Sequence, residues 1–312
     1  MPSSGRYWGT IRFLLAMAIL AAAAQSLAAQ EVTFRMDVKL VSLFVNVTDQ
    51  NGAIVGGLAK EDFAVAEDGR PQQISVFERQ SERPLNLVLA IDTSASTYKD
   101  RALDQEASKR FVNALVRSQD QMSLIEFSTF VSELSPFTNK LAQLDHALDH
   151  LRGDNATALY DAIYLGSQRL GPKEGRKVLV LVSDGEDTVN NTTYAQALEQ
   201  ALRNEVMIYS IIDVPIEASA GRSIGGEHAL ITLAEQTGGK SFYADQDGLD
   251  KAFARVSEDL RTQYLIGYYP KNELKGVDFH RFQVTVPRAT QEAYNIRYRT
   301  GYYSDSPVKA QN

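Results

Sequence analysis

The sequence lacks cysteine and has little histidine or tryptophan, and these scarcities exclude several kinds of protein. The chain of 312 residues contains 0 Cys, 4 His and 1 Trp. Without cysteine there is no disulfide framework, and no cysteine is available for lipid attachment. A small secreted fold stabilised by disulfide bonds is therefore excluded.

Common catalytic motifs are missing as well. No Gly-x-Gly-x-x-Gly or Gly-x-x-x-x-Gly-Lys-Ser/Thr phosphate-binding loop follows the first buried strand. His146 and His150 have the spacing of a zinc protease helix, but Ala147 stands where that motif has its glutamate. We therefore interpret the two histidines as surface residues beside a stripe of leucines.

Positive charge is in the minority, with 32 Lys and Arg against 39 Asp and Glu and a formal net charge of −7. An acidic chain is repelled by the phosphates of nucleic acid and by anionic membrane surfaces. We therefore expect neither as a partner.

The longest apolar run lies at the N-terminus. Arg6 and Arg12 precede the apolar residues 13–24, and small residues follow at Ala28 and Ala29. This order is typical of a secretory signal peptide, here residues 1–28. The apolar run is shorter than the roughly 20 residues of a spanning helix, so we expect no stable membrane insertion after cleavage. An exported chain without cysteine favours a bacterial periplasmic or secreted protein.

Patterning divides the rest of the chain into three regions and a short tail. Residues 84–263 alternate buried strands with amphipathic helices, which predicts an α/β domain with a doubly wound, mostly parallel sheet. Residues 31–83 and 264–303 have the pattern of short strands, and residues 304–312 form the tail. Because neither β region is large enough to be stable alone, we expect them to form one β-sandwich into which the α/β domain is inserted. Two independent β appendages remain the alternative.

The strand predicted at Leu85–Ile91 organises the α/β domain. Its one polar residue is Asn86, as expected for a strand that is buried on both faces of a parallel sheet. Asp92, Ser94 and Ser96 follow at alternate positions, at the carboxyl end of the strand, where open α/β sheets bind ligands. Their oxygen atoms suit Mg²⁺, Mn²⁺ or Ca²⁺ rather than zinc or copper.

This pattern, Asp-x-Ser-x-Ser, resembles the first loop of the metal-ion-dependent adhesion site of von Willebrand factor A domains. Two later segments resemble the second and third loops of that site, in the order found in the family: Gly153-Asp-Asn-Ala-Thr157 and Ser183-Asp184-Gly185. Residues 57–63, 67–71 and 264–270 also resemble the flanking β segments of bacterial proteins related to this family.

The resemblance implies a set of metal ligands. The hydroxyls of Ser94, Ser96 and Thr157 would bind the ion directly, and Asp92 and Asp184 would hold it directly or through water. Glu186 and Asp187 could tune the site, although solvated loop acids are the alternative interpretation. Thr157 would also suit the start of a helix as a capping residue.

The function that the resemblance implies is metal-dependent binding of a partner protein outside the cytoplasm. Because hydroxyl ligands are neutral, the ion keeps an open position and positive charge for a carboxylate of the partner. Two alternatives remain: a structural scaffold of the cell envelope with a stabilising metal site, and a Mg²⁺-dependent hydrolase. The hydrolase is disfavoured for two reasons. Haloacid-dehalogenase phosphatases need a second aspartate two residues after the first, and none stands there after Asp92. In addition, no adjacent general base accompanies the oxygen ligands.

Tyrosines cluster at residues 264–269 and 294–303. They would form either a second contact surface or part of the packing of a sheet.

Overall fold

The computed structural model describes residues 40–79, 83–95, 101–189, 191–213, 223–244, 248–271, 279–287 and 294–304. The predicted signal peptide, Ser96 and residues 305–312 lie outside these ranges. Over the described residues the strands form three sheets, one in the α/β domain and two in the β-sandwich. None of the helices within these ranges is both long enough and apolar enough to cross a membrane.

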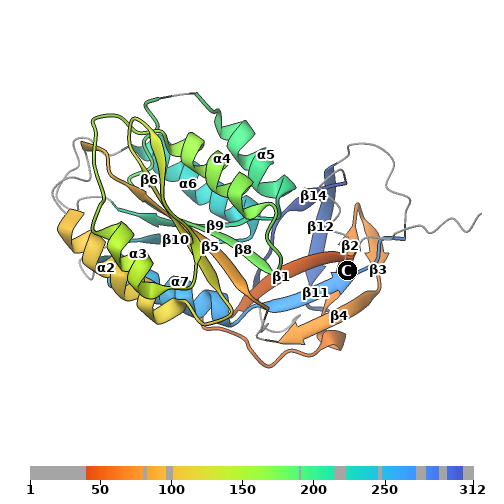
Figure 1. Ribbon diagram of the computed structural model, residues 1–312. Coiled ribbons are helices and arrows are strands. Elements are labelled where there is room, and N and C mark those ends of the chain that lie inside the picture. The colour runs from red at the N-terminus through yellow and green to blue at the C-terminus, as the bar shows by residue number, and fades with distance from the viewer. Residues whose placement is uncertain are drawn as a thin grey trace, which may run out of the picture. The chain divides into compact units, whose positions relative to one another are not determined.

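The central sheet has the strand order β10-β9-β8-β5-β6-β7 (Figure 1). Its strands, in chain order, are β5 (Leu85–Asp92), β6 (Gln121–Phe127), β7 (Val131–Thr138), β8 (Arg176–Ser183), β9 (Met207–Ile212) and β10 (Ser241–Tyr243). Neighbours pair in parallel, except that β7 pairs with β6 in the antiparallel direction at the edge. The predicted mostly parallel sheet is confirmed.

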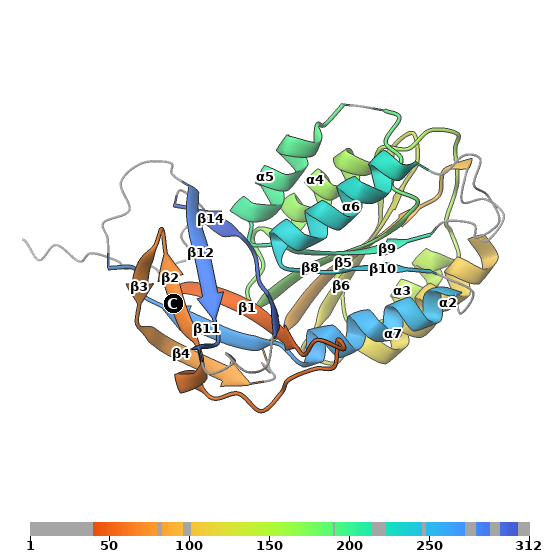
Figure 2. The same ribbon diagram turned by 180° about the vertical axis from the view of Figure 1, so that it is seen from behind.

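Helices cover both faces of this sheet, as the two opposite views show (Figures 1 and 2). One face carries α2 (Arg101–Leu115), α3 (Leu141–Leu148) and α7 (Gly248–Arg261), and the other carries α4 (Leu159–Leu170), α5 (Tyr194–Arg203) and α6 (Ile224–Thr237). Along β5, Leu87 and Leu89 pack toward the first face, while Val88 and Ala90 pack toward the second. This double burial is why β5 is apolar almost throughout.

Two details of the helices differ from the sequence pattern. Leu103, Ala107, Phe111 and Leu115 recur every four residues along α2, yet Leu103 is 71% exposed. The other three residues belong to the core, where Phe111 stacks on Phe253 of α7 with ring centroids 4.3 Å apart. The sequence pattern predicts a short helix at residues 229–237. In the structure this helix, α6, begins earlier, at Ile224, because the Ser223 hydroxyl caps its first turn by accepting a hydrogen bond from the Gly226 N–H.

The strands on either side of the α/β domain in the sequence pair with each other in the β-sandwich. One sheet has the order β13-β1-β11-β4 and the other has the order β14-β12-β2-β3. The strands are β1 (Val41–Thr48), β2 (Ala64–Glu67), β3 (Arg70–Gln72), β4 (Ile74–Arg79), β11 (Tyr264–Tyr268), β12 (Phe279–Thr285), β13 (Asn295–Arg297) and β14 (Gly301–Tyr303), with a 3-10 turn at Lys60–Asp62. Both sheets contribute to one apolar core, so the N- and C-terminal regions form a shared sandwich.

The segment 294–303, expected as one β region, divides between the two sheets. β13 pairs with β1, whereas β14 pairs with β12. Thr300, between them, donates its N–H to the carbonyl of Gln236 near the end of α6, at 2.9 Å. Gly238, which ends α6, lies so close that an added Cβ would be 2.5 Å from the Arg299 nitrogen. The end of α6 therefore fixes the point at which the chain changes sheets.

Most of the clustered tyrosines belong to the sandwich core. Tyr264, Tyr268 and Tyr302 are almost completely buried, whereas Tyr269 is 51% exposed. The packing interpretation therefore holds for these three residues.

A buried polar network joins the sandwich to α7. The Asp259 carboxylate accepts hydrogen bonds from the Tyr209 hydroxyl of β9, at 2.6 Å, and from Arg297 of β13. The carbonyl of Asp259 accepts another from Asn46 of β1, at 2.9 Å. Because each partner comes from a different element, these bonds fix α7 against both β1 and β13.

Truncation of β5 tests the packing of the central sheet. We expect Leu89→Ala to lower the free energy of unfolding by about 2–5 kcal/mol, because Leu89 is fully buried and its removal leaves a cavity. Leu103→Ala, the matched control on an exposed leucine, should change it by less than about 1 kcal/mol. Denaturant unfolding measures both, and equal effects of the two substitutions would contradict the packing described.

Candidate metal site of the central sheet

The candidate site lies at the carboxyl edge, defined here as the edge of the central sheet at which β5, β6, β8 and β9 end. β5 and β8 are neighbouring parallel strands, with Ile91 opposite Val182. Their last residues therefore meet, and the Ser183 hydroxyl donates a hydrogen bond of 2.7 Å to Asp92 Oδ2. This contact joins the first predicted loop to the third.

Asp92 is an unusually placed carboxylate. It is buried, and its Oδ1 accepts a hydrogen bond of 2.9 Å from the Ser94 N–H. Burial, with a smaller contribution from the nearby Asp184 carboxylate, raises the pKa of Asp92 to about 6, although hydrogen bonds from Ser94 and Ser183 oppose the rise. A cation beside these two acids would offset the cost of burying the charge.

The second predicted loop is held between β6 and the third loop. The N–H of Thr157 donates to the Thr188 hydroxyl at 2.8 Å, and its carbonyl accepts from the Thr188 N–H at 2.9 Å. The next residue, Ala158, donates its N–H to the carbonyl of Ser128 just after β6, at 2.8 Å. Thr157 is thereby brought to the same edge of the sheet as Asp92.

The first loop is attached to β6 in a similar way. Thr93 donates its N–H to the Phe127 carbonyl at 2.9 Å. All three predicted loops are therefore connected by hydrogen bonds. Four of the residues predicted as ligands belong to this connected edge: Asp92, Ser94, Thr157 and Asp184. Ser96 lies outside the described residues.

Thr157 does not cap the following helix with its side chain. The N-cap residue of α4 is Ala158. Across the described part of the chain, no hydrogen bond engages the Thr157 hydroxyl, although the residue is only 3% exposed. A hydroxyl without a partner among the described residues is available to a ligand.

The two acids after Asp184 have different environments. Glu186 is exposed, and its N–H donates to Asp184 Oδ1 at 3.1 Å. Asp187 Oδ1 accepts a hydrogen bond of 3.2 Å from the N–H of Tyr160 in the first turn of α4. Asp187 therefore supports the start of the helix next to Thr157, which differs from the role of a solvated loop acid.

Sequence reasoning missed the contribution of Ser183 and of a pair of glycines. Ser183 is fully buried, and its hydroxyl also accepts a hydrogen bond from the Gly185 N–H at 3.1 Å. A Cβ added to Gly185, whose φ is 89°, would lie 2.5 Å from the carbonyl carbon of Gly226. The third loop thus packs directly on the start of α6. The one signal in the sequence was a polar residue at the end of the apolar strand β8.

The donor set fits a hard divalent cation. Asp92 and Asp184 offer carboxylate oxygens, and Ser94 and Thr157 offer hydroxyls, which are the ligand types that Mg²⁺, Mn²⁺ and Ca²⁺ prefer. The Thr157 hydroxyl makes no hydrogen bond to the described residues, and a bound cation would give it a partner. The same cation would lower the raised pKa of Asp92.

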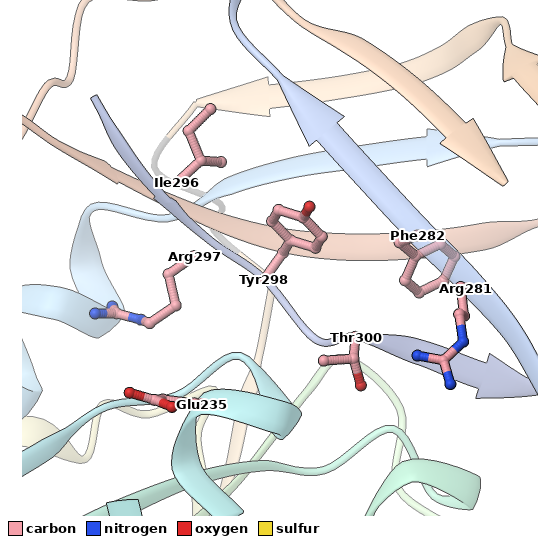
Figure 3. A pocket seen from close by; sticks show the side chains of 7 residues that line it. All are labelled: Glu235, Arg281, Phe282, Ile296, Arg297, Tyr298 and Thr300. Atoms are coloured by element: carbon pink, nitrogen blue, oxygen red, sulfur yellow. The ribbon is translucent and has the colours of Figure 1, made fainter. Parts of the chain in front are cut away.

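A separate cavity of about 400 Å³ lies between α6 and the β-sandwich. Glu235 and Arg297 lie at one end of it and Arg281 and Phe282 at the other (Figure 3). Its lining contains no predicted metal ligand, and Glu235 lies near the end of α6 that is remote from the carboxyl edge.

The region from β5 to the loop after β8 belongs to a known family. Residues 87–186 match the von Willebrand factor type A domain. The chain contains a von Willebrand factor type A domain. The matched range includes Asp92, Thr157 and Asp184, so the family resemblance predicted from the three loops is confirmed. No curated protein matches the chain.

Solved structures resemble this A domain at low sequence identity. One is the conserved hypothetical protein BatB from Bacteroides thetaiotaomicron, with 17% identity and a TM-score of 0.47 over 56% of this chain and 97% of that chain. Another is proximal thread matrix protein 1 from the mussel byssus, with 16% identity and a TM-score of 0.50 over 62% of this chain and 49% of that chain. A structure of the mussel protein with a zinc-occupied MIDAS motif has 16% identity and a TM-score of 0.49 over 61% and 48% of the two chains. At this identity the likeness to the mussel protein shows the fold.

The raised pKa of Asp92 predicts a pH effect in metal-free protein. The folded state binds the proton of the Asp92 carboxyl group more tightly than the unfolded state does. The contribution of this protonation to the free energy of unfolding is therefore largest below about pH 4. It is lost as the pH rises to about 6. The loss amounts to at most about 3 kcal/mol.

Asp92→Asn removes this titration. In the presence of a chelator, the unfolding free energy of the variant relative to wild type should rise between pH 4 and pH 7. Denaturant titrations at several pH values measure the difference. A difference that stays constant over this range would contradict the environment assigned to Asp92.

Proposed function

We propose that this protein is an exported, metal-dependent protein-binding module. A divalent cation, Mg²⁺ or alternatively Mn²⁺ or Ca²⁺, would be held by Asp92, Ser94, Ser96, Thr157 and Asp184. The observation that carries the proposal is the hydrogen-bonded assembly of three loops at the carboxyl edge of the A domain.

The roles of the residues follow from their chemistry. The Ser94 and Thr157 hydroxyls would bind the cation without neutralising it, and Asp92 and Asp184 would supply the balancing negative charge. Ser183 would orient Asp92, and Asp187 would position the start of α4. A cation held in this way keeps a site for an outside oxygen ligand, and the carboxylate of a partner protein has the required charge.

Two exposed apolar side chains next to the site favour a protein as the partner. Phe130 is 74% exposed and lies two residues from Ser128, whose carbonyl binds the N–H of Ala158. Ile224 is 77% exposed and lies two residues from Gly226, which packs against Gly185 in the third loop. Exposed apolar residues at two sides of a charged centre are typical of a protein-binding surface.

Export is proposed from the N-terminal pattern of Arg6, Arg12 and the apolar run at residues 13–24. The proposed role is binding rather than catalysis, because the carboxylates and hydroxyls of the site would all be engaged in holding the cation. A stabilising metal site in an envelope scaffold is the competing function, and the following experiment separates the two.

Capture of partners from the exported fraction tests the metal-dependent function. We expect at least one protein to be retained by wild type with Mg²⁺ and to be lost with EDTA or in Asp92→Ala, because both changes remove the cation. Glu174→Gln is the matched control, since it changes an exposed acid just before β8, at the end of that strand opposite the carboxyl edge. Identical captures in all conditions, with a melting temperature that falls on chelation, would favour the scaffold.

Substitution of the flanking apolar residues tests the surface separately from the metal. Phe130→Ser and Ile224→Ser should each lower the affinity for the captured partner by about tenfold, while the affinity for Mg²⁺ is unchanged. Tyr269→Ser, an exposed aromatic in the β-sandwich, is the control and should have no effect. Affinity measured with the purified partner decides the outcome. Unchanged affinity in both variants would place the contact surface elsewhere.

A further inference from the structure

A second group of metal-ligating side chains lies in the β-sandwich. Glu67 is the last residue of β2, Asp68 begins the turn to β3, and His280 is on β12. One carboxylate oxygen of each acid and one ring nitrogen of His280 lie within 4.8 Å of one another. Unlike the carboxyl edge of the A domain, this group contains an imidazole.

The turn between β2 and β3 holds Asp68 in place. Asp68 and Gly69 have φ values of 48° and 77°, the left-handed pair of a tight Asp-Gly hairpin. Asp68 Oδ1 accepts a hydrogen bond of 2.9 Å from the Arg281 N–H, and Asp68 N–H donates to the Arg281 carbonyl at 3.0 Å. The second carboxylate oxygen, Oδ2, lies 2.7 Å from His280 Nδ1. The carboxylate is therefore fixed beside the imidazole before any ligand arrives.

Glu67 is the decisive member of the group. It is 0% exposed, and its Oε2 accepts hydrogen bonds from the hydroxyls of Tyr268 and Tyr302, at 2.5 and 3.2 Å. Its Oε1 is buried and, across the described residues, has no hydrogen-bond partner. A buried carboxylate oxygen without a partner is costly, so its presence next to Asp68 and His280 indicates a missing ligand of positive charge.

We propose that Glu67, Asp68 and His280 form a binding site for a divalent transition-metal ion such as Zn²⁺ or Mn²⁺. Two carboxylates and one imidazole are ligands that these ions accept, and three protein ligands leave further positions for water. Mg²⁺ and Ca²⁺ prefer oxygen alone, so the imidazole separates this site from the one at the carboxyl edge.

Hydrogen bonds from neighbouring groups orient the two carboxylates of the site. The Tyr268 and Tyr302 hydroxyls donate to Oε2 of Glu67, so the other oxygen, Oε1, is left for an ion. The Arg281 N–H donates to Oδ1 of Asp68, so Oδ2 is the oxygen that faces His280.

An ion at this position would link the N-terminal and C-terminal strands within one sheet of the sandwich. Glu67 and Asp68 precede the A domain in the sequence, and His280 follows it. The ion would link the β2–β3 turn to β12, adding to the register in which Glu67 pairs with Phe282. Because a ligand that binds only the folded state stabilises it, we expect Zn²⁺ to raise the melting temperature.

Titration of the metal-free full chain with Zn²⁺ alone tests the proposal. The Asp92→Asn background weakens the site at the carboxyl edge, so that zinc binding there is separated from binding in the sandwich. We expect one equivalent of Zn²⁺ to bind in this background. Adding His280→Gln should lower the affinity for this Zn²⁺ by at least about tenfold. His146→Gln is the matched control, because His146 and His150 have ring centroids 4.3 Å apart and could bind zinc themselves. No zinc binding in the background, or binding that is lost in His146→Gln and kept in His280→Gln, would overturn the proposal.

Imidazole resonances of wild type give a second readout that does not depend on the variants folding. With 4 His in the chain, each imidazole can be followed separately. Because the carboxyl edge of wild type can also take up Zn²⁺, the His280 signal should shift within the first two equivalents, and before those of His146 and His150. A His280 signal that is unchanged after two equivalents would also overturn the proposal.

Discussion

The parallel pairing of β5 with β8 is the constraint on which the candidate site depends. Both strands are buried on two faces, so their register is fixed by helices on each side of the sheet. A shift by one residue would turn Asp92 away from Ser183 and place polar groups in the core. The hydrogen bond between these two side chains is therefore a consequence of packing far from the site, and it aligns the loops that follow both strands.

Much of the fold could be predicted from the sequence because the signals were local. The apolar strand before Asp92, the acid after β8 and the alternation of strands and helices together indicated the sheet and its family. Other features depended on contacts that no local pattern records. The exposure of Leu103 is one such feature, and another is the start of α6 at Ile224, where the Ser223 hydroxyl caps the helix.

The candidate site was predictable in composition but only partly in geometry. Asp92, Thr157 and Asp184 follow motifs that can be read along the chain. Ser183 could not be assigned its contact with Asp92 without knowing that β5 and β8 are neighbours. The group formed by Glu67, Asp68 and His280 was invisible for a similar reason, since more than two hundred residues separate its acids from its histidine.

The pairing of β1 with β11 has a consequence for the order in which the chain folds. Val41 lies opposite Tyr268, so the whole A domain is synthesised between two strands that share a ladder. Until β11 emerges, β1 must keep its hydrogen-bonding edge unpaired, whereas the A domain already has the complete sequence of its own sheet. During synthesis or translocation the inserted domain can therefore fold first, and its closely spaced ends then bring the first and last strands together.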